Sequence, residues 1–486
     1  MLRGDSVPSF KHDRVTPAQI IILGFLLLIF TGAVLLMLPF STQEPGGASF
    51  GDALFTATSA TCVTGLVLHD TALYWSPFGQ LVILLLIQVG GMGVVTIAVA
   101  IFMFAGKRIG LKQRWVMQES ISAPQVGGIV RMTGFILKTA FLIEGIGALL
   151  LALRFCPQFG LGRGLWYAVF HSVSAFCNAG FDLMGVNSPF SSLTDYVGDP
   201  LVSNVIAFLI IIGGVGFLTW NDIREHKLHF RRYRLQSKLI LTTTLALILT
   251  GLLFFLLYEF EQGQWVDMSL WERINAAFFQ SVTPRTAGFN TVDLTGLSQP
   301  AQLLIILLML VGGSPGSTAG GFKTTTLAVM LLGIRAVFRH KERPQCFGRR
   351  IADESIRNAS AIFLLYLLLF LTGGILICCI DGVPLMAALF EAASAIGTVG
   401  LSLGITPELS GASRLILIFL MYFGRVGGLT MIYAVTAKGA PELSQFPQER
   451  VTIGGDRRGT NHEVSAFDRV GTVRPPYGPE APGTAP

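Results

Sequence analysis

The chain has 486 residues, of which 52% are apolar and only 13% are charged. Soluble globular domains carry about 25% charged residues, so this composition excludes that class and indicates a polytopic membrane protein. The net charge of +6 does not indicate nucleic-acid binding, because the basic residues lie in short loops next to apolar segments.

Eight apolar stretches are long enough to cross a hydrocarbon layer of about 30 Å. They cover residues 18–40, 79–104, 131–153, 201–220, 239–258, 300–334, 359–380 and 411–436. An even number of crossings predicts that both termini lie on the same side of the membrane. The first stretch lacks the cleavage pattern of a signal peptide, so we expect it to be retained.

The distribution of Lys and Arg predicts the orientation. Basic residues are concentrated in the N-terminal segment and in the connections 105–131, 221–238 and 335–357. The alternate loops, 41–78, 154–200, 259–299 and 381–410, contain only Arg154, Arg163, Arg273 and Arg285. Because basic loops stay in the cytoplasm, we expect a multi-pass membrane protein with both termini cytoplasmic.

Each of the four outer loops contains a glycine turn that follows a short amphipathic stretch. The turn glycines are Gly65, Gly180, Gly288 and Gly400, spaced 115, 108 and 112 residues apart. The preceding stretches, at 51–61, 165–176, 272–283 and 385–396, are too short to cross and are predicted to be re-entrant pore helices. The repeat predicts an all-α integral membrane protein in which four helix–pore loop–helix units, with eight transmembrane helices, surround one central ion pore.

This organisation divides the chain into six parts. We expect a cytoplasmic N-terminus (1–17), pore repeats at 18–104, 131–220, 239–334 and 359–436, and a cytoplasmic C-terminal tail (437–486). The tail beyond residue 454 is rich in Gly, Pro and charge, which predicts disorder.

The sixth apolar stretch cannot be one continuous helix. Its centre combines a proline with many glycines and hydroxyl residues, which interrupt helices. The predicted break at 312–321 consists of Gly312, Gly313, Ser314, Pro315, Gly316, Ser317, Thr318, Ala319, Gly320 and Gly321. A nucleotide-binding P-loop is excluded, because Phe322 separates the last glycine from Lys323.

The four turns resemble the pore loops of the Trk/Ktr/HKT superfamily of potassium transporters. The segments that carry the resemblance are 58–66, 174–181, 285–291 and 394–401, and the match extends from about residue 18 to 454. With eight predicted crossings, the chain is most similar to a KtrB-type, TrkH-related pore subunit, which implies a location in a bacterial plasma (inner) membrane. The segment 446–454 also resembles the short C-terminal segment of that type.

The resemblance implies a selectivity filter in which backbone carbonyls coordinate potassium. The filter residues would be Val63, Thr64, Gly65, Asn178, Ala179, Gly180, Thr286, Ala287, Gly288, Thr398, Val399 and Gly400. In plant members of the superfamily, a serine at the first filter glycine accompanies sodium selectivity. Gly65 therefore favours potassium as the transported ion, with sodium as a candidate coupling or stimulating ion and no organic cofactor bound by this chain.

The resemblance also implies that the 312–321 break is an intracellular gate, with Lys323 and Arg425 beside it. A buried arginine costs about 2.5–3.5 kcal/mol on insertion scales, so Arg425 should face the protein interior and have partners. One hypothesis is that Arg425 caps carbonyls of the broken helix. The other is that it is an electrostatic barrier that holds the gating loop, and both can hold.

The partners implied by the resemblance are a second copy of this chain and a cytosolic regulatory subunit. The latter would be an RCK-type, KtrA/TrkA-like protein that binds adenine nucleotides, with the 221–238 loop and the C-terminal segment as docking surfaces. The remaining partner is the lipid bilayer, and no nucleic acid is expected.

Several polar residues have two open interpretations. Asp70, Asp182 and Asp293 follow their filter glycines closely and either concentrate cations at the pore mouth or are solvated loop carboxylates. His171 and Glu391 lie in predicted pore helices, where a satisfied buried polar group is more common than an ion ligand. Glu144 lies in a crossing helix without an assigned role.

Two other functional classes were compared with the pore. A sodium-coupled or sodium-selective carrier, of this or an unrelated transporter fold, would also contain broken helices, but a carrier with inverted repeats would not place four pore loops in one orientation. An enzyme is not expected, because no nucleophile, base and orienting group form a recognisable motif.

Overall fold

The computed structural model describes residues 16–104, 110–120, 128–227, 229–259, 262–341, 343–428 and 430–431. These residues all belong to one compact unit, 1–436. The predicted tail 437–486 and nearly all of the predicted N-terminal segment lie outside the described residues, so the predictions for them stay predictions.

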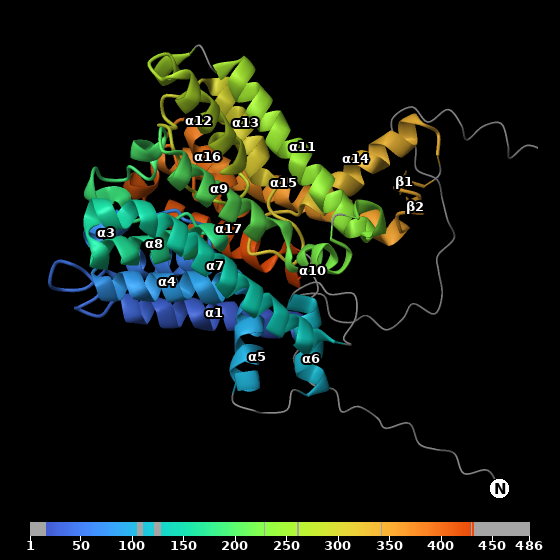
Figure 1. Cartoon of the computed structure of the whole chain (residues 1–486), viewed down its shortest axis with the longest axis horizontal. Helices are drawn as coiled ribbons and strands as arrows, with labels where there is room; N and C mark the ends of the chain where they lie inside the picture. Colours follow the sequence, from blue (N-terminus) through green and yellow to red (C-terminus); the bar gives the residue numbers. More distant parts are fainter. Residues whose placement is uncertain are drawn as a thin grey trace, which may run out of the picture. The chain divides into compact units, whose positions relative to one another are not determined.

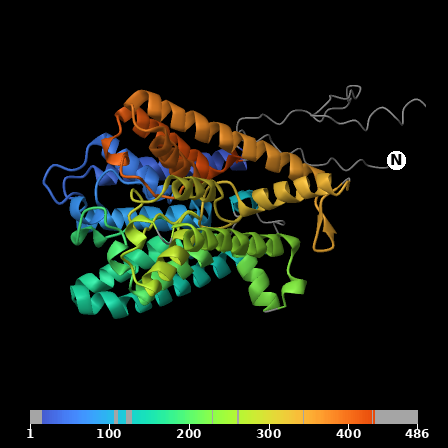
Figure 2. The same ribbon diagram turned by 90° about the horizontal axis from the view of Figure 1, so that it is seen from above.

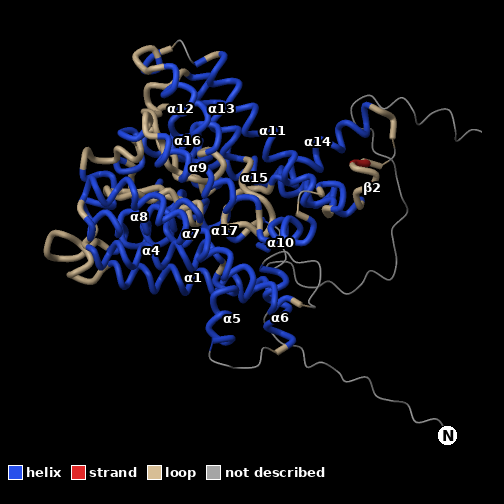
Figure 3. The backbone as a smooth tube through the Cα atoms, viewed as in Figure 1, coloured by secondary structure: helices blue, strands red, loops and turns tan. Residues whose placement is uncertain are grey.

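The described chain is mostly helical (Figures 1 and 3). Along the sequence, the helices recur in four groups. Repeat 1 contains α1 (Pro17–Leu36), α2 (Phe50–Thr61), α3 (Thr71–Tyr74), α4 (Pro77–Met92) and α5 (Val94–Phe104). Repeat 2 contains α7 (Ile129–Phe159), α8 (Leu161–Phe176), α9 (Pro200–Val215) and α10 (Phe217–His226). Repeat 3 contains α11 (Leu235–Leu257), α12 (Leu270–Val282), α13 (Gln299–Leu310) and α14 (Thr324–Phe338). Repeat 4 contains α15 (Asp353–Asp381), α16 (Leu385–Gly397) and α17 (Gly411–Val426).

Smaller elements connect or decorate the repeats. Helix α6 (Leu111–Ser120) lies between repeats 1 and 2, and a two-residue antiparallel pair, β1 (Gln345–Cys346) and β2 (Arg349–Arg350), lies between α14 and α15 (Figure 2). The short 3-10 turns are η1 (Met184–Val186), η2 (Thr194–Tyr196), η3 (Phe230–Arg232), η5 (Gly263–Trp265) and η6 (Thr406–Glu408).

The first helix of each repeat is a long apolar helix. In the described part of the chain, α1, α7, α11 and α15 are the four single helices long and apolar enough to cross a membrane, or six spans result if two bent pairs are counted. Each has only about a third of its apolar window buried, and large side chains such as Leu27, Leu149 and Leu257 are exposed. Apolar surface of this extent is typical of helices that face lipid, so this is a multi-pass membrane protein.

The second long segment of each repeat is interrupted. The pair α4–α5 bends by 97° and the pair α9–α10 by 94°, while residues 311–323 separate α13 from α14, and α17 has only 16 residues. The sequence predicted the third of these breaks. It did not predict the bends within the apolar stretches 79–104 and 201–220, where the backbone changes direction at Gly93 and Gly216 with φ of +89° and +96°. Such dihedrals are accessible to glycine and end an α-helix.

The long helix that follows each turn glycine, which is α4, α9, α13 or α17, begins with a side-chain cap. Ser76, Asp199, Ser298 and Ser410 accept backbone N–H groups of the first turns of α4, α9, α13 and α17. The first three helices also have proline in the first or second position, where no N–H donor is lost. These caps fix the residues at which the loops end and α4, α9, α13 and α17 begin.

Candidate functional site: four filter loops in a ring

Four short helices lie at the positions predicted for pore helices. They are α2, α8, α12 and α16, and most of their residues are buried. Each ends three to six residues before its turn glycine. The partially negative C-terminal ends therefore come directly before the turns.

The turns share one backbone pattern. The residue two positions before each glycine has a positive φ, between +51° and +67°, at Val63, Asn178, Thr286 and Thr398. The glycines Gly65, Gly180, Gly288 and Gly400 have φ of +91°, +71°, +81° and +93°. Left-handed conformations are uncommon for non-glycine residues, and for Val and Thr they are outliers. Their occurrence at one register in all four repeats identifies a common loop geometry.

A hydroxyl on each pore helix fastens the turn. Ser59 and Ser394 accept the N–H of Gly65 and Gly400 at 3.1 and 3.0 Å. Ser174 and Thr283 instead donate to the carbonyl of the phenylalanine after the glycine, Phe181 and Phe289. The sequence analysis missed these four tethers, although their hydroxyl residues recur at the same alignment position and could have been found there.

The four turns form a closed ring. A Cβ built on Gly65 would lie 2.5 Å from the carbonyl oxygen of Ala179, one on Gly180 would lie 2.8 Å from that of Ala287, and one on Gly288 would lie 2.6 Å from that of Val399. A Cβ on Gly400 would overlap the carbonyl oxygen of Thr64, which returns to the first repeat. Each glycine thus lies against the carbonyl before the glycine of the next repeat, and the order 1–2–3–4 closes on itself.

A cavity of about 400 Å³ opens above this ring. All four turn glycines line it, whereas the side chains of Val63, Thr64, Asn178, Ala179, Thr286, Ala287, Thr398 and Val399 are fully buried. The predicted filter residues are therefore brought together, and the glycine backbone rather than these side chains borders the cavity. Carbonyl rings of this kind can replace the hydration shell of a monovalent cation.

Four carboxylate residues line the same cavity: Asp70, Asp182, Asp293 and Glu408. Each of the three aspartates accepts a backbone N–H of its own loop, at 2.9 Å in each case, so they also shape the turns. The pKa of Asp182 is raised to about 7, chiefly by burial and also by the Asp70 carboxylate, with the Met184 amide acting in the opposite direction. The sequence analysis missed Glu408.

On the other side of the ring, residues 311–323 form an irregular loop packed against the turns of repeats 2 and 4. The Thr318 hydroxyl donates to the carbonyl of Phe176 at 3.0 Å and lies 3.4 Å from Oδ1 of Asn178. A Cβ on Gly320 would overlap the side chain of Thr398. The Ser314 and Phe217 amides cross-link the loop to the bend between α9 and α10, donating to the Gly214 and Gly316 carbonyls.

Arg425 connects this loop to repeat 1. Its guanidinium donates to the Thr318 carbonyl in the loop and to the carbonyls of Gly90 and Gly91 at the end of α4, the last at 2.8 Å. Lys323 donates to the carbonyls of Ala319 and Gly320 at 2.9 and 3.3 Å, which lie within its own loop. Both cations also line a second cavity of about 200 Å³ below the loop. Both hypotheses for Arg425, that it caps carbonyls of the broken helix and that it is a barrier holding the loop, require contacts of this kind with backbone carbonyls.

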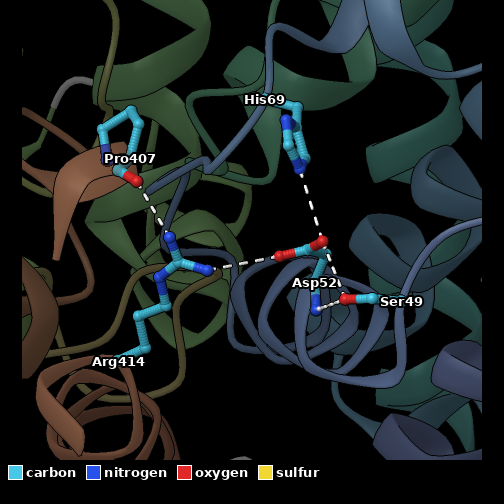
Figure 4. A network of polar contacts seen from close by, with 5 residues as sticks. All are labelled: Ser49, Asp52, His69, Pro407 and Arg414. Atoms are coloured by element: carbon cyan, nitrogen blue, oxygen red, sulfur yellow. Dashed lines mark hydrogen bonds and ion pairs between the residues drawn. The ribbon is translucent and has the colours of Figure 1, made fainter. Parts of the chain in front are cut away.

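Repeats 4 and 1 are also joined beside the cavity of about 400 Å³, hereafter the outer cavity, which Pro407 lines. Nη1 of Arg414 in α17 lies 3.3 Å from Oδ1 of Asp52 in α2, and Nη2 donates to the Pro407 carbonyl at 2.8 Å (Figure 4). The other carboxylate oxygen of Asp52 lies 3.5 Å from Nε2 of His69 and accepts the Ser49 hydroxyl at 2.8 Å. This network closes the seam between the ends of the repeat array.

The remaining polar candidates are buried and paired. Nε2 of His171 accepts the Leu183 amide, the Glu391 carboxylate accepts three donors of residues 402–406, and the Glu144 carboxylate accepts Gln88 Nε2 at 3.0 and 3.1 Å. His171 and Glu391 are therefore satisfied buried groups, as the commoner interpretation of their sequence position predicted.

The chain is similar to known cation transporters over almost its whole length. The family model TrkH, described as cation transport protein, matches residues 9–442. The "Ktr system potassium uptake protein B" of Bacillus subtilis is 41% identical over 445 residues, which cover 91% of this chain and 98% of that protein. The "Potassium/sodium uptake protein NtpJ" of Enterococcus hirae is 39% identical over 449 residues, with coverage of 91% and 98%.

A solved structure supports the fold. The potassium transporter TrkH from Vibrio parahaemolyticus superposes with a TM-score of 0.69 at 19% sequence identity, covering 88% of this chain and 86% of that one. The family match, the two relatives and the ring of four helix–pore loop–helix units agree. The chain belongs to the TrkH family of cation transport proteins, which are transporters and not enzymes.

Proposed function

We propose that this chain is the pore subunit of a potassium uptake system. The observation that carries the proposal is the closed ring of four turns, in which each glycine lies against the carbonyl before the next one. One chain supplies all four sides of such a ring, as a cation filter with fourfold pseudosymmetry requires. The names of relatives, which describe potassium uptake and potassium/sodium uptake, favour the same substrate class.

Potassium would be coordinated by backbone carbonyls at the turns that contain Gly65, Gly180, Gly288 and Gly400. The buried side chains beside them differ between repeats, which a backbone filter tolerates. The acidic lining of the outer cavity would raise the local concentration of cations before they enter. Sodium as the transported or coupling ion is the second candidate, favoured by the printed function of the Enterococcus relative.

The 312–321 loop would be the gate. It lies beneath the filter, and it is held to neighbouring repeats by Arg425 and by the amides of Ser314 and Phe217. Opening would require these contacts to break together, with Lys323 moving with the loop. The pore repeats are proposed with the bounds expected from the sequence: 18–104, 131–220, 239–334 and 359–436. The first helices of repeats 2, 3 and 4 begin a few residues earlier, at Ile129, Leu235 and Asp353.

Regulation would come from outside this chain. The word "system" in the names of the Ktr relatives is consistent with a further component, and we propose a cytosolic RCK-type, nucleotide-binding subunit and a homodimer of this chain. Both termini would be cytoplasmic in a bacterial plasma membrane, because the basic connections would then lie inside.

Rubidium uptake into proteoliposomes tests the filter and its ion. Uptake by the purified protein should be inhibited more strongly by potassium than by sodium, and Gly65→Ser should weaken that preference. The matched control is Gly145→Ser, at a glycine of α7 whose Cβ would meet nothing within 4 Å. Equal inhibition by both ions would favour the sodium candidate, and absence of monovalent-cation flux even after deletion of the 312–321 loop would contradict the pore.

A further inference from the structure

The pore helices share a second buried polar position besides the hydroxyl tether. Immediately after the phenylalanine that aligns the four repeats come Thr56, His171, Gln280 and Glu391. Their side chains are 3%, 0%, 0% and 0% exposed. A polar residue at one fully buried register in four repeats requires a physical explanation, since burying such groups is unfavourable unless they are hydrogen-bonded.

In two repeats this side chain binds the same backbone group. Nε2 of His171 accepts the N–H of Leu183 at 3.2 Å, and Oε1 of Glu391 accepts the N–H of Leu403 at 3.1 Å. Leu183 and Leu403 each lie three residues after the turn glycine. The two side chains are chemically unrelated, so the shared contact reflects what the loop needs: an acceptor for an amide in a segment without regular secondary structure.

Both side chains are themselves held in place. The Nδ1 of His171 lies 2.7 Å from the Tyr167 carbonyl, an arrangement that leaves Nε2 as the acceptor, and its ring lies 6.3 Å from that of Phe289 in the next repeat. The Glu391 carboxylate also accepts the hydroxyls of Ser402 and Thr406 at 2.6 and 2.7 Å. A fixed acceptor on a buried helix defines where the segment after the filter can lie.

We infer that His171 and Glu391 are positioning residues that hold the loops leaving the filter and so set its discrimination between potassium and sodium. Together with Ser174 and Ser394, each gives the pore helix two hydrogen bonds to the segment that runs from the turn glycine to the third residue after it. Discrimination between ions of different size depends on how far the carbonyls can move. The inference rests on the proposed function for the ions that it names.

The test compares apolar and conservative variants. His171→Leu and Glu391→Leu remove the acceptor, whereas His171→Gln and Glu391→Gln keep an amide oxygen that can accept the same N–H group. Among the described residues, the natural Gln280 at this register of repeat 3 has no hydrogen-bond partner, so only repeats 2 and 4 are tested. Thr56→Val is the matched control in repeat 1, since among the described residues the Thr56 side chain has no hydrogen bond to the exit loop. Potassium and sodium inhibition of rubidium uptake is measured for each variant, beside hydrogen exchange of segments 181–186 and 401–406.

We expect the leucine variants to lose the preference for potassium by about fivefold or more, the equivalent of about 1 kcal/mol, and the glutamine variants and Thr56→Val to retain it. Exchange should accelerate in the leucine variants alone. The inference would be overturned if the leucine variants kept both the potassium preference and the exchange rates of the wild type. It would also be overturned if they lost flux for both ions in equal proportion and glutamine did not restore it. If the wild-type protein shows no preference for potassium, the proposed function fails. The positioning role is tested separately, because unchanged hydrogen exchange in the leucine variants would refute it in either case.

Discussion

Gly400 lies against the carbonyl of Thr64, at the junction where the last repeat meets the first. The same relationship holds at the other three junctions, with different clearances. Because the obstructing atoms are backbone, they cannot move aside as a flexible side chain can. The four glycines should therefore differ in how they respond to an added methyl group.

Gly65→Ala should impair uptake more than Gly180→Ala. The added Cβ would lie 2.5 Å from a carbonyl oxygen at Gly65 but 2.8 Å at Gly180, and φ of +91° is further from the left-handed helical region than +71°. A strained residue of this kind costs about 1–3 kcal/mol, so we expect initial rubidium uptake to fall about tenfold or more for Gly65→Ala. Gly145→Ala, at an open helical site, should leave uptake unchanged; equal losses for the two filter variants would contradict the ranking.

Arg425→Ala should increase flux in the absence of any regulatory partner. The substitution removes charge-assisted hydrogen bonds from the Thr318 carbonyl and from the end of α4. Each such bond contributes about 1.5–3 kcal/mol, so the equilibrium of the loop should shift about tenfold or more towards release. Basal rubidium uptake measures this shift. Arg335→Ala, at an exposed arginine of α14, is the control and should behave as wild type.

Gly216→Ala should be more damaging than Gly93→Ala. Both residues have positive φ, at +96° and +89°, so both substitutions strain the bend by about 1–3 kcal/mol. At Gly216 the Cβ would also lie 2.8 Å from the Pro315 carbonyl of the loop, whereas at Gly93 the nearest atom is the Ser120 hydroxyl at 3.5 Å. Thermal unfolding and basal flux should both change more for Gly216→Ala. If basal flux changes equally for both substitutions, the close contact between Gly216 and the Pro315 carbonyl has no effect on the loop.

The Asp52–Arg414 pair should stabilise the seam between repeats 1 and 4. Both side chains are mainly buried, with 20% and 30% exposed, so the ion pair is less screened than one at the surface. A double-mutant cycle with Asp52→Asn and Arg414→Gln should give a coupling of about 0.5–3 kcal/mol, measured by thermal unfolding in detergent. Arg154 and Asp199, paired at 2.6 Å within repeat 2, provide a comparison cycle away from the seam. Strict additivity at Asp52 and Arg414 would show that the pair contributes nothing.

The repeat architecture could be predicted because a phenylalanine and a glycine recur in all four units, ten residues apart in three of them and nine in the third. The predicted pore helices, at 51–61, 165–176, 272–283 and 385–396, agree within a few residues with α2, α8, α12 and α16. The third break was also predictable, since Pro315 and its neighbours exclude a helix over that segment.

The bends at Gly93 and Gly216 could not be predicted in the same way. Each glycine ends a Gly-Gly-x-Gly segment within a continuous apolar stretch, without the proline that marks the third break, and only the dihedral angle distinguishes a bend from a continuing helix. The contact between Asp52 and Arg414 joins residues 362 positions apart, for which neither periodicity nor local composition gives a signal. The tethers at Ser59 and Glu391 were visible as polar residues, but their partners depend on how the loops fold back.

The closed ring has a consequence for biosynthesis. Thr64 leaves the ribosome more than three hundred residues before Gly400, yet the two backbones lie against each other in the finished protein. The first turn must therefore remain in the bilayer without its last neighbour until the fourth repeat has been inserted. A chain that stops before α16 would contain three complete turns and no closed ring, so under the proposed function conduction would depend on the translation of almost the entire membrane domain.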